Sequence, residues 1–213
     1  TPQKFAMSVE ENIQKMTCNS YKQLSPTKFK ESKILISGCG TGQQIIGANN
    51  YKNVQITAID LSDRSLAYAK RKVDEYGMKN VRFIVMDLLD IGLLNEKFDV
   101  IECGGVLHHM SDPNKGLSVL SQTLVSGGYM KIGLYSKKSR TAVTKARHLI
   151  ESLKKDSIHD KIRYFRQKVF NGDYPELQDL TMMIDFYGLS TCRDYCFHVC
   201  EHQFTIDDII SLL

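Results

Sequence analysis

The chain has 213 residues, of which 42% are hydrophobic and 24% are charged, and its formal net charge is +4. That length corresponds to one domain, or to one domain with an insertion, and it allows a core that needs no disulfide bonds. The composition excludes fibrous and low-complexity chains, and no apolar run approaches the ~20 residues of a membrane-spanning helix. The six cysteines are scattered along the chain. We therefore expect a reducing, cytoplasmic environment and no membrane partner.

The positive charge is concentrated in one segment. Residues 131–168 hold 12 Lys or Arg against 3 Asp or Glu, whereas the rest of the chain is mildly acidic. A solvated helical face explains such a segment, and so does a surface that faces an anionic substrate or a nucleic acid. The sequence leaves both interpretations open.

In the first half of the chain, short apolar runs alternate with helical patterns. Runs rich in Val and Ile predict buried strands at 33–37, 54–60, 81–87 and 98–103. Helical spacing occurs at 63–77 and 112–128, and a fifth strand is expected at 129–136. Strands that alternate with helices predict an α/β fold with a doubly wound, mostly parallel sheet over residues 31–136. Residues 1–30 are expected to form an N-terminal helical cap.

After residue 136 the pattern changes to helices. Three helical stretches are expected at 140–155, 157–170 and 175–188. We assign residues 137–190 to a basic helical insertion that forms the acceptor side, and residues 191–213 to a C-terminal segment of the core. No strand is recognisable after residue 200, so a final β-hairpin of the sheet is either weakly marked or missing from this chain.

The first predicted strand runs directly into a glycine-rich turn. Gly38, Gly40 and Gly42 leave the backbone bare at the edge of the sheet where open parallel sheets bind ligands. Asp60 ends the second strand, and a carboxylate there can accept both ribose hydroxyls of an adenosine. A nicotinamide or flavin dinucleotide site is the alternative, but its G-x-G-x-x-G pattern requires glycine where this chain has Gln43.

The next two strand ends favour a different adenosyl cofactor. Asp87 follows the third strand, where it can accept a hydrogen bond from the exocyclic amine of an adenine. The fourth strand is followed by the paired His108 and His109. Polar groups at four strand ends are harder to attribute to chance than any one of them.

These motifs resemble those of the class I methyltransferases that use S-adenosylmethionine. The resemblance covers roughly residues 30–136 and rests on GCGTG, AIDLS, VMDLL, FDVIECGGVLHHMSDP and SGGYMKIGLYS; the LHHxxDP run is typical of one branch of that superfamily. It implies a Rossmann-like fold, S-adenosylmethionine as the cofactor and methyl transfer as the activity. It also implies a cofactor site formed by Gly38, Cys39, Gly40, Thr41, Gly42, Asp60, Leu61, Asp87, Leu88 and Cys103.

One position departs from the family pattern. The family commonly has an acidic residue two positions before the first glycine, which helps to hold the amino group of the cofactor, and this chain has Ile36 there. We expect the amino group to rely instead on backbone carbonyls near Gly38 and Cys103.

Methyl transfer needs a general base only where the accepting atom must lose a proton early. His108 and His109 are both candidates, and nothing in the sequence chooses between them. A small-molecule acceptor is our first expectation, and a protein or RNA that uses the basic segment is the second. An NAD(P)-dependent oxidoreductase and a cofactor-binding module without catalysis are the alternatives from other classes.

The stretch 192–202 is rich in cysteine and histidine. Cys192, Cys196 and Cys200 lack the spacing of iron–sulfur or zinc sites, so we predict no metal and expect the cysteines to act as small apolar residues. Glu201, His198 and His202 are expected to line the acceptor pocket.

Overall fold

A computed structural model describes Val9, Glu11 and residues 31–48 and 51–213 of the chain. These residues form two compact units. The first unit holds the described residues up to Leu107 together with Asp112–Gly133, and the second holds His108–Ser111 together with Leu134–Leu213. The helical cap expected over residues 1–30 lies outside the described residues except for Val9 and Glu11, which are both helical.

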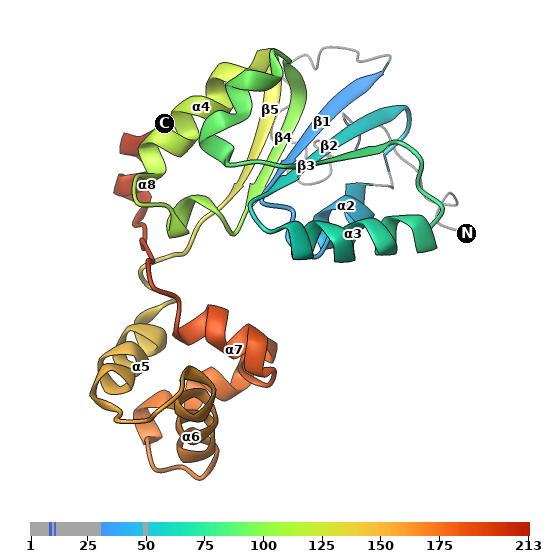
Figure 1. Ribbon diagram of the computed structural model, residues 1–213. Coiled ribbons are helices and arrows are strands. Elements are labelled where there is room, and N and C mark those ends of the chain that lie inside the picture. Colours follow the sequence, from blue (N-terminus) through green and yellow to red (C-terminus); the bar gives the residue numbers. More distant parts are fainter. Residues whose placement is uncertain (1–8, 10, 12–30, 49–50) are drawn as a thin grey trace. The chain divides into compact units, whose positions relative to one another are not determined.

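The first unit is built on a five-stranded sheet in the order β3-β2-β1-β4-β5 (Figure 1). Its strands are β1 (Ser32–Ser37), β2 (Val54–Asp60), β3 (Val81–Val85), β4 (Phe98–Gly104) and β5 (Leu124–Gly133). All neighbouring strands are parallel, and Ile34 of β1 lies opposite both Ile56 of β2 and Val100 of β4. The strand order reverses between β1 and β4, which is where open parallel sheets bind ligands. The predicted Rossmann-like α/β fold is confirmed.

Helices cover both faces of this sheet (Figure 1). On one face lie α2 (Gln43–Ala48) and α3 (Asp63–Glu75), and on the other lies α4 (Pro113–Thr123). Buried side chains of α2 and α3 join Ile34 and Ile36 of β1 in one core cluster because alternate residues of a strand point to the same face. Two 3₁₀ segments, η2 (Leu88–Leu94) and η3 (Leu107–His109), follow β3 and β4.

Local capping explains where the longer helices of this unit begin. The Ser62 side chain accepts the backbone N–H of Ser65 at the start of α3, and Asp112 accepts that of Lys115 at the start of α4. At its other end α4 stops earlier than expected, and β5 already begins at Leu124. The expected Gly-Gly turn is instead an irregularity within β5, where Gly127 has a positive φ of 76° and the pairing register with β4 shifts.

The second unit is helical. It contains α5 (Thr141–Ser152), α6 (Ile158–Phe170), the 3₁₀ segments η4 (Pro175–Met182) and η5 (Ile184–Phe186), α7 (Leu189–Cys196) and α8 (Ile206–Leu212). Side chains from α5 through α7 form one core, which includes Val143, Phe165, Leu180, Phe186 and Cys192. None of the described helices in either unit is long and apolar enough to span a bilayer.

Three expectations for this part of the chain are wrong. The stretch 175–188 forms η4 and η5 instead of one helix, because Met183 between them has an extended backbone (φ −96°, ψ 128°). Residues 191–213 belong to the helical unit and not to the core of the sheet, since Cys192 and Cys196 are buried in the helical core. The boundary between the units falls after Gly133, not after residue 136.

The final β-hairpin, which the sequence leaves as either weakly marked or missing, is not formed within the described residues. Phe204 makes an isolated parallel bridge with Ser136, and its backbone N–H donates to the carbonyl of Tyr135 at 2.8 Å. A single bridge is too short to count as a strand. The sheet of the described chain therefore has five strands.

Candidate functional site

The glycine loop, residues 38–42, follows β1 directly and leads into α2. All three of its glycines have positive φ values: 69° at Gly38, 51° at Gly40 and 95° at Gly42. Residues with a side chain are strained in this conformation, so the path of the loop depends on glycine. The loop lies at the carboxyl edge of the sheet, as the sequence predicts.

The three glycines differ in what a side chain would meet. A Cβ at Gly38 would lie 2.1 Å from Cγ2 of Val106, and a Cβ at Gly42 would lie 3.0 Å from Cβ of Ala69. These two glycines allow close packing within the protein. A Cβ at Gly40 would meet no atom within 4 Å, so only this glycine of the loop borders open space. Space for a ligand directly beside the Cα atom therefore exists at Gly40, whereas Gly38 and Gly42 can offer a ligand only their backbone groups.

The carboxylate of Asp60 anchors the glycine loop to the end of β2. Its Oδ2 accepts the backbone N–H of Gly40 at 2.8 Å, and its Oδ1 accepts that of Ser62 at 2.8 Å. Each carboxylate oxygen has two lone-pair directions, so both oxygens retain capacity for a further donor such as a ribose hydroxyl. The next residue, Leu61, is 70% exposed and offers an apolar surface beside this carboxylate.

Asp87 lies after β3 and begins η2. Its Oδ1 accepts the backbone N–H of Leu89 at 2.9 Å, which makes it the N-cap of that segment. The cap fixes the orientation of the carboxylate, and its lone pairs are not exhausted by one bond. Leu88 beside it is buried, unlike Leu61.

The remaining predicted cofactor residues differ in how far their side chains are exposed to solvent. Thr41 is exposed, whereas Cys39 and Cys103 are buried. Burial raises the pKa of the Cys39 thiol to about 12, with a further contribution from the Asp60 carboxylate, and burial raises the pKa of the Cys103 thiol to about 11. Both thiols are therefore neutral at physiological pH, and these residues can contribute backbone groups but no thiolate chemistry.

Gln44 is a residue of this edge that the sequence analysis missed. Its Nε2 donates to the carbonyl of Gly104 at 3.2 Å, which connects the first turn of α2 to the end of β4. Its Oε1 is buried without a hydrogen-bond partner. Nothing in the residue type or its spacing indicates this contact, because the two residues are 60 positions apart and meet only in the folded chain.

His108 and His109 group with the second unit and have different surroundings. His108 is buried and stacks on Tyr135, with ring centroids 3.8 Å apart. His109 is only partly buried and stacks on His198, with centroids 3.6 Å apart. The structure therefore separates two histidines that the sequence leaves equivalent.

The contacts of His109 define its protonation. Its Nδ1 lies 2.8 Å from the carbonyl oxygen of Cys200, and because a carbonyl can only accept, Nδ1 carries the proton. The lone pair of the neutral ring is then on Nε2. Burial lowers the pKa of His109, and this outweighs the opposing effect of the Cys200 carbonyl. The neutral, proton-accepting form is thus favoured.

A buried ion pair in the second unit was also missed by the sequence analysis. Arg140 donates from Nε to Oε1 of Glu201 at 3.0 Å and from Nη2 to Oε2, and Nη2 also donates to the Tyr195 carbonyl at 2.7 Å. The two charged side chains are 4% and 1% exposed. Arg147 approaches Oε2 of Glu201 to 3.4 Å, and Gln203 donates to Oε1 at 2.9 Å.

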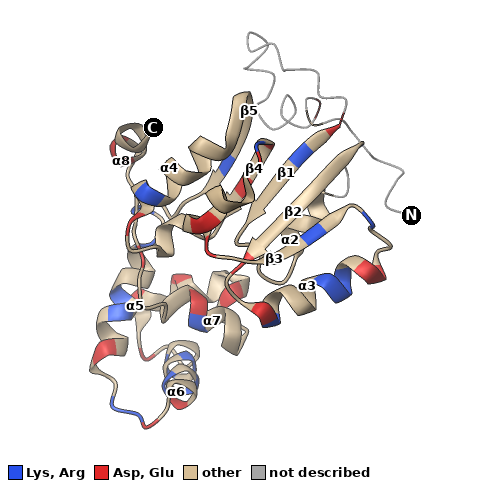
Figure 2. Cartoon of the chain, turned by 45° about the horizontal axis from the view of Figure 1, so that its top comes forward, with Lys and Arg blue, Asp and Glu red and all other residues tan. Residues whose placement is uncertain are grey.

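This pair changes two expectations from the sequence. Arg140 lies over the rings of Tyr135 and Tyr195, at 4.0 and 4.7 Å from their centroids, so it is not part of an exposed basic surface. Glu201 has its oxygens occupied by Arg140, Arg147 and Gln203, which does not fit a wall of an open acceptor pocket. Other Lys and Arg residues of this unit lie along α5, α6 and α7 and in the segments beside them (Figure 2).

The cysteines and histidines of the described residues were also candidates for a metal site. No group of three or more His, Cys, Asp or Glu in the part of the chain that the structure describes could hold a metal ion. Cys192 and Cys196 are fully buried in the helical core, as expected for small apolar residues, whereas Cys200 is only partly buried and its Sγ donates to the carbonyl of Met110 at 3.6 Å.

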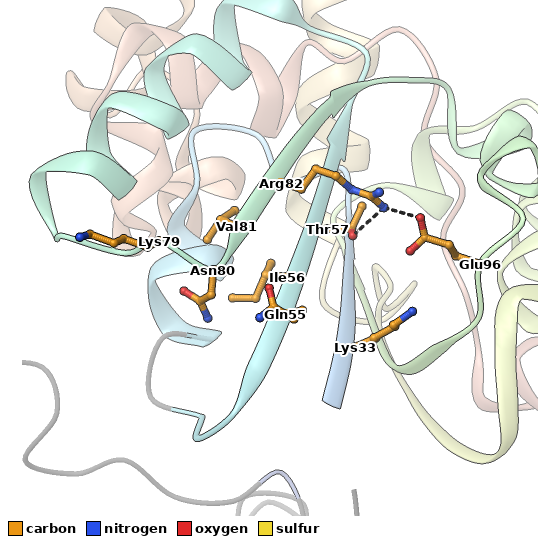
Figure 3. Close-up of a pocket in the computed structure, with 9 residues that line it drawn as sticks. All are labelled: Lys33, Gln55, Ile56, Thr57, Lys79, Asn80, Val81, Arg82 and Glu96. Atoms are coloured by element: carbon orange, nitrogen blue, oxygen red, sulfur yellow. Dashed lines mark hydrogen bonds and ion pairs between the residues drawn. The ribbon is translucent and has the colours of Figure 1, made fainter. Parts of the chain in front are cut away.

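A groove of about 310 Å³ lies at the amino ends of β1, β2 and β3 (Figure 3). Arg82 borders it and donates to Oγ1 of Thr57 at 3.1 Å and to Glu96 at 2.9 Å. This is the edge of the sheet opposite to the glycine loop. Because parallel sheets bind ligands at their carboxyl ends, the groove does not mark the cofactor site.

Comparison with known proteins identifies the family. Residues 28–183 match the sequence model of a methyltransferase domain. A protein of Synechococcus sp. named only as uncharacterized is 36% identical over 123 residues, which are 57% of this chain and 30% of that protein. A malonyl-[acyl-carrier protein] O-methyltransferase of Paenibacillus sp. is 32% identical over 104 residues, or 47% of this chain and 38% of that protein. The chain thus spans less than half the length of these relatives.

A solved structure shares the fold over most of the chain. PKMT2 from Rickettsia typhi superposes with a TM-score of 0.69 and 21% identity over 88% of this chain and 38% of its own. The same protein in complex with AdoHcy gives a TM-score of 0.68, 20% identity and coverage of 89% and 39%. At these identities the likeness concerns the fold, and the family is shown by the sequence match, which covers most of the chain. The chain therefore belongs to the methyltransferase domain family, the class I methyltransferases that use S-adenosylmethionine.

Proposed function

We propose that this domain holds S-adenosylmethionine at the glycine loop and transfers its methyl group to a small-molecule acceptor. When bound, the cofactor supplies a methyl group that its sulfonium already activates, so the protein contributes binding, orientation and electrostatics. The residues proposed to hold it are Gly38, Cys39, Gly40, Thr41, Gly42, Asp60, Leu61, Asp87, Leu88 and Cys103.

The observation that carries this proposal is the contact between Asp60 and Gly40. The 2.8 Å bond from the Gly40 N–H to Asp60 Oδ2 holds a carboxylate beside the one loop glycine that borders open space. A ribose with two adjacent hydroxyls fits that arrangement, since each hydroxyl can donate to one carboxylate oxygen. The exposed Leu61 offers the apolar surface that a purine face requires, and Asp87 offers an acceptor for its amine.

His109 is the proposed general base for an acceptor that must lose a proton. The Cys200 carbonyl holds the proton of His109 on Nδ1 and leaves Nε2 as the basic nitrogen. His108 is less suited to this role because it is buried and stacked on Tyr135. The Paenibacillus relative is a malonyl-[acyl-carrier protein] O-methyltransferase, which supports an oxygen atom as the acceptor.

Calorimetric titration of the full chain with S-adenosylmethionine, S-adenosylhomocysteine and NADH tests the cofactor part of the proposal. We expect binding of the two adenosyl sulfur compounds and no binding of NADH. Binding of NADH alone would refute the assignment of the glycine loop.

Methyl-labelled S-adenosylmethionine tests the acceptor part. The domain is incubated with labelled cofactor and cell extract, and the products are separated by size. Label in compounds of low molecular mass supports a small-molecule acceptor. Label that appears only in protein or RNA contradicts it.

A further inference from the structure

Gln44 presents a hydrogen-bond acceptor where the glycine loop meets the end of β4. Its Nε2 donates to the carbonyl of Gly104 at 3.2 Å. Because that carbonyl can only accept, the contact fixes which end of the amide is nitrogen. The atom of Gln44 that is buried without a partner is therefore an oxygen, Oε1, and it calls for a donor.

A buried acceptor without a donor is destabilising, and such atoms are rare in folded proteins. An unpartnered acceptor at the ligand-binding edge of the sheet is explained if the bound ligand supplies the hydrogen-bond donor. The terminal torsion of a glutamine side chain is broad, so the carboxamide can turn and expose Oε1 to a ligand, and this turn also moves Nε2 away from the Gly104 carbonyl. A Cβ at Gly104 would lie only 2.9 Å from Nε2 of Gln44, so the carboxamide rests directly against the end of β4.

S-adenosylmethionine carries three kinds of hydrogen-bond donor: the ribose hydroxyls, the adenine amine and the ammonium group of its methionine part. Asp60 and Asp87 are proposed to receive the first two. For the third, β1 supplies no acid at this end, because Ile36 is apolar and fully buried in the core cluster of the sheet. Backbone carbonyls near Gly38 and Cys103 are expected to accept from the ammonium group, and a carboxamide oxygen on another element can add a side-chain acceptor.

We infer that Oε1 of Gln44 accepts a hydrogen bond from the ammonium group of S-adenosylmethionine, which makes Gln44 a residue that selects for the amino-acid part of the cofactor. The inference rests on the proposed function, because it places the cofactor at the glycine loop. It assigns to a neutral side chain on α2 the task that an acid on β1 would otherwise perform.

A thermodynamic cycle that combines removal of the Gln44 carboxamide with removal of the ligand's amino group tests this inference. The full chain is titrated by calorimetry with S-adenosylhomocysteine and with the analogue in which hydrogen replaces the amino group. Hydrogen bonds to charged groups correspond to roughly 10- to 100-fold in affinity, so the unmodified chain is expected to prefer S-adenosylhomocysteine by that factor. The Gln44→Met variant should lose most of this preference, and it should bind the deaminated analogue as tightly as the unmodified chain does. Gln43→Met, at the exposed neighbouring position, is the matched control and should keep the preference.

The outcomes separate the two proposals. Failure of the unmodified chain to bind either compound refutes the cofactor site itself. Equal affinity of the unmodified chain for both compounds overturns the role of Gln44, and this measurement needs no variant to fold. An unchanged preference in Gln44→Met, or an equal loss for both ligands, also overturns it. Ser37 provides a last comparison, since its buried Oγ has the thiol of Cys103 as its only indicated side-chain partner. A preference that Ser37→Ala abolishes and Gln44→Met retains would assign the ammonium to Ser37.

Discussion

Arg140 and Glu201 form a two-point hydrogen-bonded ion pair inside the helical unit, although they are 61 positions apart in the sequence. Arg140 immediately precedes α5, and Glu201 follows α7, so the pair ties the beginning of the unit to its last third. Since the two side chains are 4% and 1% exposed, neither charge can be hydrated if the other is removed.

Arg140→Met should therefore destabilise the helical unit strongly. The substitution leaves the buried Glu201 carboxylate with only Arg147, at 3.4 Å, and Gln203 as partners, so the loss should approach the value of about 3–5 kcal/mol that breaking a buried pair costs. Urea unfolding followed by circular dichroism measures the change. Arg163→Met is the matched control, because its pair with Asp160 has side chains that are 65% and 57% exposed, and it should change the free energy of unfolding by less than about 1 kcal/mol. Equal effects for the two variants would contradict the burial of the Arg140 pair.

The pH dependence of stability should reflect Glu201. Burial raises the pKa of the Glu201 carboxyl, but hydrogen bonds from Arg140 and Gln203 and the charges of Arg140 and Arg147 together leave this pKa below its ordinary value of 4.5. The unfolded chain then binds the proton more tightly than the folded chain does. The stabilisation is complete above the ordinary pKa and is lost as the pH falls through the lowered one.

Glu201→Gln should remove that part of the acid sensitivity. The urea midpoint of the variant should fall less between pH 5 and about pH 3 than that of the unmodified chain. Glu151→Gln, on the exposed surface of α5, should leave the pH profile as it is. Parallel profiles for all three proteins would argue against the lowered pKa.

His109→Gln should slow methyl transfer to a proton-losing acceptor by about 10²- to 10⁴-fold, which is the usual contribution of a general base. Burial lowers the pKa of His109, so the active neutral form is present above that pKa, and the acid limb of kcat/KM should lie below the ordinary histidine value of 6.5. The variant should lack this limb. A pH profile that keeps the same acid limb in His109→Gln would remove His109 from the chemistry.

The glycine loop allows a comparison between two alanine substitutions. Gly38→Ala would place a Cβ 2.1 Å from Cγ2 of Val106, whereas Gly40→Ala would meet open space and carry only the cost of a positive φ, about 1–2 kcal/mol. Gly38→Ala should therefore destabilise the first unit more than Gly40→Ala does. Val106→Ala added to Gly38→Ala should restore part of the loss, as a double-mutant cycle of unfolding free energies would show. Simple additivity of the two changes would mean that Val106 does not limit this position.

Asp60→Ala should weaken S-adenosylhomocysteine binding by roughly 10- to 100-fold, because it removes an acceptor for the ribose hydroxyls. It also removes the anchor of the Gly40 N–H, so the loop loses its fixed position. Calorimetry measures the change, and Asp74→Ala on the exposed surface of α3 is the control. Unchanged affinity in a folded Asp60→Ala protein would refute the ribose assignment.

The sequence by itself determined the features that depend on local periodicity and on the ends of strands. The alternation of strand and helical patterns predicted the parallel sheet, because burial on both faces imposes apolar runs on each strand. The glycines at 38, 40 and 42 and the acid at 60 could be placed together, since the carboxyl ends of parallel strands share one edge.

Only the tertiary structure decided features that depend on contacts between distant residues. Gln44 meets Gly104 across 60 positions, and Arg140 meets Glu201 across 61, and neither pair leaves a local signal. The grouping of residues 191–213 with the helical unit follows from where their buried side chains find apolar partners, which periodicity does not specify. His109 differs from His108 in its partial exposure, in its contact with the ring of His198 and in its hydrogen bond to the carbonyl of Cys200, 91 residues later. The protonation of a histidine is set by such neighbours in space and not by its neighbours in sequence.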